Sequence, residues 1–77
     1  MSSLKGSAQA RQTLAENLRA LRSSMNLSQE QLAERAGFHR TYVSQVERCV
    51  SNISLDNLQK LADILQVEIW ELLRPSA

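Results

Sequence analysis

A chain of 77 residues with 43% hydrophobic and 22% charged residues has the composition of one small folded domain, which excludes most multi-domain enzymes. No run of consecutive apolar residues exceeds two, which excludes a membrane-spanning helix and the hydrophobic core of a signal peptide. The single cysteine, Cys49, cannot form an internal disulfide, so the sequence predicts a cytoplasmic protein that is stabilised by helix packing.

The net charge of +1 conceals an uneven distribution along the chain. Residues 1–48 contain seven basic and four acidic residues, a net charge of +3, whereas residues 49–77 contain two basic and four acidic residues, a net charge of −2. Seven of the nine basic residues are arginine, whose planar guanidinium suits bidentate contacts with phosphates and base edges. The two halves of the chain are therefore expected to face different partners.

The N-terminal segment 1–9 is small and polar without helical periodicity, which predicts a flexible arm ahead of a single domain over residues 10–74. From residue 10 onward, apolar residues recur at steps of three and four, which is the spacing of one helix face. This pattern predicts a first helix over residues 10–24. Its expected buried positions are Leu14, Leu18, Leu21 and Met25.

A second helix is predicted over residues 29–36 by signals at both of its ends. Ser28 offers its hydroxyl as an N-cap, and Gln31 three residues later completes a capping box. Gly37 ends the helix, because glycine adopts the left-handed backbone conformation without a side-chain clash. The residues that this helix is expected to bury are Leu32, Ala33 and Ala36.

Residues 40–48 are predicted to form a third helix with two contrasting faces. Val43, Val46 and Val50 follow one another at steps of three and four, so this side is expected to be buried. The opposite face is polar, and each of its side chains can form hydrogen bonds. The residues of this polar face are Arg40, Thr41, Ser44, Gln45 and Arg48.

Two further helices complete the predicted domain after a loop over residues 49–53. Ser54 caps a fourth helix that ends near Gln66, and a short last helix is predicted over residues 68–73, before Pro75. The sequence contains no strand pattern and no internal repeat, so it predicts an all-α fold of five short helices. The apolar stripe of the fourth helix consists of Leu55, Leu58, Leu61, Ala62 and Leu65.

The second and third predicted helices are joined by a tight turn at Gly37, which is the arrangement of a helix-turn-helix. Because a helix fits the major groove of B-DNA, residues near the start of the second helix of such a motif can reach base edges. Arginine pairs with guanine, glutamine with adenine, and the threonine methyl contacts that of thymine, so Arg40, Thr41 and Gln45 are candidate base contacts. The candidates for contacts with the DNA backbone are Gln29, His39, Tyr42, Ser44, Arg48 and Asn52.

A longer pattern extends on both sides of this motif. It consists of Leu27-Ser28-Gln29, Leu32-Ala33, Gly37, Tyr42-Val43-Ser44, Glu47-Arg48, Leu55, Leu58, Leu61-Ala62 and Leu65-Gln66-Val67. In its order and spacing the pattern resembles the phage repressor and Cro type of helix-turn-helix domain over residues 10–73. The run of residues 40–44 is similar to restriction–modification controller proteins, which are dimeric regulators. The resemblance implies duplex DNA binding and an internal ion pair between Arg22 and Glu47.

Two positions depart from the pattern of this family. Cys49 stands where the family usually has glycine with a positive φ, so either Cys49 carries backbone strain or this turn is built differently. Asn52 is followed by Ile53 where the family often has asparagine followed by proline. The path of this loop, and with it the contact expected of Asn52, is left open by the sequence.

Several residues permit a second interpretation. The face with Arg40 could be an ordinary solvated helix surface, although the surrounding pattern favours DNA contact. Glu47 could be a catalytic carboxylate, but it lies on the buried side of its helix, where an acid needs a partner, so a structural ion pair is preferred. His39 could make binding sensitive to pH, although a position near phosphate is the simpler interpretation. Cys49 could sense oxidation, but no sequence feature indicates a reactive thiolate.

The last predicted helix carries an apolar surface of its own. Ile69, Leu72 and Leu73 supply an inward face, and Trp70 adds apolar area beside it. Trp70 is either a core residue or part of a dimer interface with Ile69 and Leu73, and we favour the interface because aromatic residues dominate such contacts. A dimer would place two recognition helices about 34 Å apart on the half-sites of a palindrome.

The sequence thus predicts a homodimeric, sequence-specific transcriptional regulator that represses, activates or does both. Its expected partners are double-stranded DNA and a second copy of the chain, with RNA polymerase as a further candidate. The alternative is a protein-interaction module of antitoxin or antirepressor-binding type, whose binding would depend weakly on salt. With one histidine, one cysteine and no cluster of metal ligands, the chain is not expected to be an enzyme or to bind a cofactor, metal, membrane or small molecule.

Overall fold

The computed structural model describes residues 7–75, with the backbone alone for residues 7 and 8, and this part of the chain contains five helices and no strand. The all-α prediction is therefore confirmed. The first helix begins three residues before its predicted start, and the remainder of the expected arm, residues 1–6, lies outside the described residues. The helices are α1 (Ser7–Ser24), α2 (Gln29–Ala36), α3 (Arg40–Glu47), α4 (Leu55–Leu65) and α5 (Ile69–Leu73).

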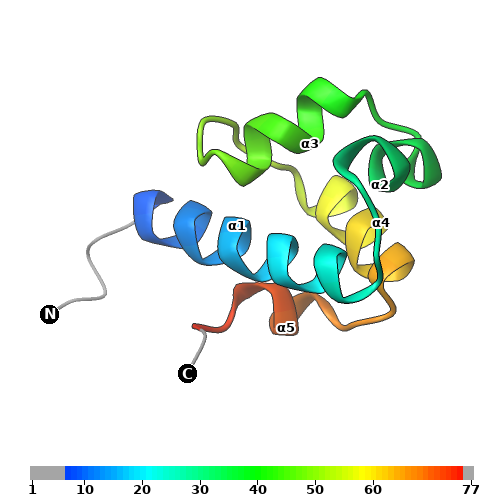
Figure 1. Cartoon of the computed structure of the whole chain (residues 1–77). Coiled ribbons are helices and arrows are strands. Elements are labelled where there is room, and N and C mark those ends of the chain that lie inside the picture. The colour runs from blue at the N-terminus through cyan, green and yellow to red at the C-terminus, as the bar shows by residue number, and fades with distance from the viewer. Residues whose placement is uncertain (1–6, 76–77) are drawn as a thin grey trace, which may run out of the picture.

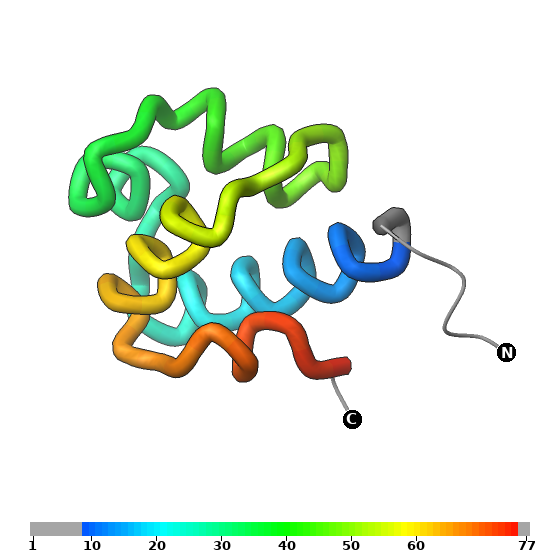
Figure 2. Tube along the Cα trace, turned by 180° about the vertical axis from the view of Figure 1, so that it is seen from behind, coloured from blue at the N-terminus to red at the C-terminus, as the bar shows by residue number. Residues whose placement is uncertain are grey.

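The longest helix, α1, runs through the middle of the molecule, with α3 on one side and α5 on the opposite side (Figure 1). Figure 2, seen from behind, shows the same order, with α4 between α3 and the last helix near the C-terminal end of α1. α2 packs against α3 and α4, and α5 packs against α1 and α4. None of the helices in the described part is long and apolar enough to cross a membrane.

Each of the five helices contributes one large, fully buried side chain to a single core. Because full burial of such a side chain stabilises a protein by about 1.5–3 kcal/mol, this shared core fixes every helix relative to the others. The five side chains are Leu18, Leu32, Val43, Leu61 and Leu72.

Hydrogen bonds at the helix ends explain where each helix stops. The predicted capping box at the start of α2 is present, with Gln31 N–H donating to Ser28 Oγ and Ser28 N–H donating to Gln31 Oε1. After each of the first four helices, one residue has a left-handed φ and the next N–H bonds to a carbonyl five residues earlier, as in a Schellman motif. The left-handed residues are Asn26, Gly37, Cys49 and Gln66.

The turn after α3 settles the two alternatives that the sequence left for Cys49. Its φ is 64°, and the N–H of Val50 donates to the carbonyl of Gln45, so the turn keeps the usual glycine conformation with a cysteine in place. A side chain in this conformation costs about 1–2 kcal/mol relative to glycine. Cys49 therefore carries the strain that the sequence raised as one possibility.

Two residues of the predicted apolar stripes are exposed, so these assignments are wrong. Val50 is 65% exposed because α3 ends at Glu47 and the left-handed turn at Cys49 directs the chain away from the buried face. Leu55 is 73% exposed, whereas Leu58 one turn later is buried. The first turn of α4 therefore projects beyond the packed core.

Candidate nucleic-acid interface

The outer face of α3 is polar and open to solvent at both of its ends. The exposed side chains are His39, which precedes the helix as its N-cap residue, Arg40, Thr41 and Arg48. Between them Ser44 and Gln45 are half-buried, and the opposite side of the helix buries Val43 and Val46 in the core. The five polar residues that the sequence assigned to this face, with His39 and Tyr42 beside them, thus lie together along α3 and its two cap positions.

Tyr42 is half-buried, and its ring packs against Phe38 in the turn between α2 and α3. The ring centroids of Tyr42 and Phe38 lie 4.9 Å apart in an edge-to-face arrangement. The Tyr42 hydroxyl accepts a hydrogen bond of 3.2 Å from the Asn57 amide, so its own proton remains available for donation. The side chain is held in place by α4 and can still present one donor.

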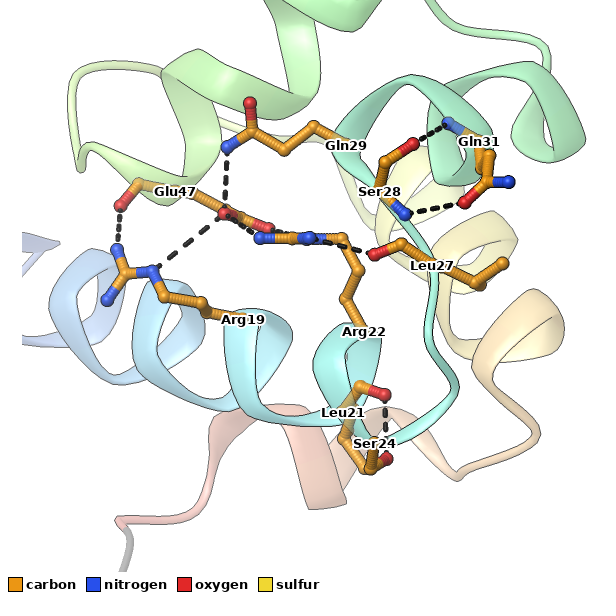
Figure 3. Close-up of polar contacts among 9 residues, drawn as sticks. All are labelled: Arg19, Leu21, Arg22, Ser24, Leu27, Ser28, Gln29, Gln31 and Glu47. Carbon is orange, nitrogen blue, oxygen red and sulfur yellow. Dashed lines mark hydrogen bonds and ion pairs between the residues drawn. The ribbon is translucent and has the colours of Figure 1, made fainter.

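A buried carboxylate fixes the C-terminal end of α3 to α1. Glu47 is only 3% exposed, and Arg22 donates to both of its carboxylate oxygens, from Nε to Oε2 at 2.7 Å and from Nη2 to Oε1 at 3.0 Å (Figure 3). Arg22 Nη1 also donates to the Leu27 carbonyl at 2.8 Å, so all three nitrogens of this guanidinium are bonded. The ion pair that the resemblance implied joins helices α1 and α3 and the turn before α2.

This geometry changes the proton affinity of the arginine. The hydrogen bonds that Arg22 donates to Glu47 raise the pKa of Arg22 above its ordinary value; partial burial opposes this effect, and the Coulombic attraction of the carboxylate adds to it. The guanidinium of Arg22 therefore holds its proton more tightly than that of a free arginine.

Gln29 occupies a more specific position than the sequence suggested. Its amide nitrogen donates to Glu47 Oε1 at 2.9 Å, and its carbonyl oxygen points away from the carboxylate (Figure 3). The side chain is half-buried at the first position of α2. Gln29 is thus held by the same acid that binds Arg22, with its second amide N–H left for another acceptor.

Two arginines of α1 join this region although the sequence analysis did not single them out. Arg19 Nη2 donates to the backbone carbonyl of Glu47 at 2.7 Å, and Arg11 Nη1 donates to Asn52 Oδ1 at 2.9 Å. Arg19 precedes Arg22 by three residues, so the spacing could have placed both on neighbouring faces of one helix. The Asn52 side chain is exposed and, with its oxygen occupied, presents amide donors in the loop after α3.

The apolar surface of α5 lies on the side of α1 opposite to α3 (Figure 1). Trp70 is 60% exposed and Leu73 is 42% exposed, whereas Ile69 is half-buried and Leu72 is fully buried. The expectation that Leu73 faces inward is therefore wrong, and so is the alternative of Trp70 as a core residue. Asn17 of α1 donates to the backbone carbonyls of Leu72 and Arg74, which holds the C-terminal end of α5 against α1.

Among residues 7–75, no group of three or more histidine, cysteine, aspartate or glutamate side chains could hold a metal ion. The chemistry that the described surface offers is hydrogen-bond donation from α3 and its neighbours and apolar contact at α5.

Comparison with known proteins identifies the family. A family model described as helix-turn-helix matches residues 18–72. The chain is 49% identical over 63 residues to control protein C.SmaI of Serratia marcescens. The aligned region covers 82% of this chain and 75% of that protein.

Two solved structures share both fold and sequence. The crystal structure of the hypothetical transcription factor NHTF from Neisseria has a TM-score of 0.86 and 45% identity, covering 90% of this chain and 78% of that chain. The restriction-modification controller protein C.AhdI from Aeromonas hydrophila has a TM-score of 0.77 and 45% identity, covering 80% of this chain and 94% of that chain. The chain therefore belongs to the helix-turn-helix family of DNA-binding transcriptional regulators.

Proposed function

We propose that this protein is a homodimeric regulator that binds a palindromic operator and controls a restriction–modification system. The observation that carries the proposal is the polar outer face of α3, where Arg40 and Thr41 are exposed at the start of a helix whose other side is buried. A helix in this position can enter the major groove with its first residues at the base edges. Glu47 and its partners hold the other end of the same helix.

Sequence is read by Arg40, Thr41 and Gln45 in this proposal, and the DNA backbone is bound around them. Arginine pairs with guanine through two hydrogen bonds, and each good bidentate pair discriminates by about 1–3 kcal/mol. Gln45 is half-buried, so only the solvent-exposed part of its side chain is available to contact a base. The backbone contacts are assigned to Gln29, His39, Tyr42, Ser44, Arg48 and Asn52.

The dimer forms through α5 in this proposal. The helix α5, which lies on the side of α1 away from α3, exposes apolar area at Trp70 and Leu73 and also carries half-buried Ile69. A twofold interface brings the same surface of both copies together, and an aromatic side chain at its centre is a typical anchor. The two α3 helices then contact two half-sites about 34 Å apart.

The assignment to restriction–modification control rests on the likeness to C.AhdI and C.SmaI. In this proposal the protein acts in the cytoplasm, where the DNA is found. Whether it represses or activates transcription would depend on where its operator lies relative to the binding site of RNA polymerase. The chain acts through binding and not through catalysis in this proposal.

The experiment is a selection of random duplex DNA with the purified protein, followed by binding of the selected duplex over a salt series. We expect a palindrome with half-sites about one helical turn apart. Affinity should fall steeply with salt, because each neutralised phosphate releases counterions. No enriched sequence, together with weak salt dependence, would overturn the proposal and favour the protein-interaction module.

A further inference from the structure

The charge around Glu47 is not balanced. Arg22 alone satisfies the carboxylate, since its guanidinium donates to both oxygens at 2.7 and 3.0 Å. Arg19 adds a second guanidinium, with its Nε 3.8 Å from Glu47 Oε1. Two positive charges therefore surround one negative charge, and the cluster as a whole is positive.

The excess positive charge lies on the side chain that faces solvent. The side chain of Arg19 is 53% exposed, against 15% for that of Arg22. Arg19 Nη2 is fixed by the Glu47 carbonyl at 2.7 Å, and the third nitrogen of its guanidinium points away from Glu47 (Figure 3). The arginine is thus oriented by the end of α3 and still presents charged donors to solvent.

Gln29 shares the same anchor. Its amide nitrogen lies 2.9 Å from Glu47 Oε1, the oxygen that Arg19 Nε approaches. Glu47 therefore orients a cationic donor from α1 through its backbone carbonyl and a neutral donor from α2 through its carboxylate. Donors held in place before binding lose little conformational entropy when the ligand arrives.

The geometry points to a phosphate-binding site in which Arg19 and Gln29 together contact one phosphodiester of the DNA backbone, with Glu47 as the positioning residue for both. A phosphodiester offers a negative charge for Arg19 and several acceptor oxygens for the remaining N–H groups of both side chains. This inference rests on the proposed function and adds Arg19 to its binding residues. The alternative is a purely structural role, in which Arg19 caps the C-terminal end of α3 and contacts no phosphate.

The test is the salt dependence of binding to the selected operator by wild-type protein, Arg19→Gln and Arg19→Lys. One phosphate contact contributes about 0.9 to the slope of log affinity against log salt. The proposed dimer loses two such contacts, one per copy, so we expect the affinity ratio of wild type to Arg19→Gln to shrink about twelvefold between about 50 and 200 mM salt. Arg19→Lys keeps the charge and should retain the wild-type slope, although it cannot bond the Glu47 carbonyl and the phosphate together.

Lys60→Gln serves as the matched control, since it removes one exposed positive charge from α4 and should leave the slope unchanged. The ranking of selected sequences should also be the same for wild type and Arg19→Gln, because phosphate contacts do not read sequence. Equal slopes for wild type and Arg19→Gln would overturn the phosphate site, as would equal losses in the glutamine and lysine variants. If the wild-type protein itself bound no operator, the proposed function would fail instead.

Discussion

Helices α3 and α5 lie on opposite sides of α1 (Figure 1). Their exposed surfaces differ in the chemical groups that they present to solvent. The α3 face is polar, and Glu47 on the buried side of the helix accepts hydrogen bonds from α1 and α2. The α3 face can remain hydrated until a polar ligand arrives. The α5 surface exposes Trp70 and Leu73, which water solvates poorly.

In the proposed function, this difference corresponds to a different kind of partner for each surface. Phosphates and base edges can replace the water on the α3 face, whereas only another apolar surface is favourable against α5. The charge distribution agrees, because the positive half of the sequence contains α3 and the negative half contains α5. Substitutions on the α3 face should therefore leave the dimer intact, and substitutions on α5 should alter DNA binding only through loss of the dimer.

The largest expected effect is the loss of unfolding free energy when Glu47, which holds α3 against α1, is replaced. Glu47→Ala leaves Arg22 without its carboxylate, and removal of one partner from a buried pair costs about 3–5 kcal/mol. Urea denaturation of the variant should show this loss in the free energy of unfolding. Glu34→Ala, at an exposed site on α2, is the control and should change it by less than about 0.5 kcal/mol. A loss below about 1 kcal/mol in Glu47→Ala would contradict the support role.

At the α5 surface, Trp70→Ala should weaken the dimer while the monomer stays folded. An aromatic anchor contributes about 2 kcal/mol or more to an interface, which corresponds to an increase of about 30-fold in the dimer dissociation constant. Sedimentation equilibrium over a range of protein concentrations measures this constant. Leu55→Ala removes a side chain that is 73% exposed elsewhere and should leave the dimer unchanged. An unaltered dimer in Trp70→Ala would show that α5 is not the interface.

On the α3 face, Arg40→Ala should weaken operator binding by about 1–3 kcal/mol and relax the preference at one base position. Gln29→Ala is the matched comparison, since loss of a phosphate contact should weaken all sequences alike. Competition binding against a set of single-base operator variants measures both effects. If the preferred sequence were the same for Arg40→Ala and wild type, the assignment of Arg40 to base reading would be wrong.

The smallest expected effect concerns pH. The raised pKa of Arg22 gives stability that is fully present below the pKa of an unfolded arginine and is lost only as pH rises through the higher folded value. The difference in unfolding free energy between wild type and Arg22→Gln should therefore stay constant between about pH 7 and pH 10. Denaturation at several pH values tests this, and a steady decline of the difference over that range would contradict it.

Local signals in the sequence were enough to predict most of the fold. α2 has its predicted bounds because Ser28, Gln31 and Gly37 act within a few residues of the helix ends. Periodicity failed where the chain leaves the helix, since it cannot detect that the left-handed turn at Cys49 precedes Val50. Nor could it show that Leu55 lies beyond the core.

The candidate site was predictable only in part. The polar face of α3 follows from residue spacing, and the pairing of Arg22 with Glu47 came from the family resemblance. Arg19 and Arg11 were missed because their partners lie 28 and 41 residues away along the chain. In the sequence, an arginine that bonds across the fold looks the same as one that is only solvated.

The measurement that tests the separation of the two surfaces most directly is an NMR titration of isotope-labelled protein with the selected operator. It is made at concentrations at which the protein is already dimeric without DNA. We predict that the backbone amides of Gln29 and of residues 39–48 shift on binding, while those of α5 (Ile69–Leu73) do not. Shifts concentrated in α5, with the amides of α3 unchanged, would contradict the assignment of DNA to α3 and of the second copy to α5.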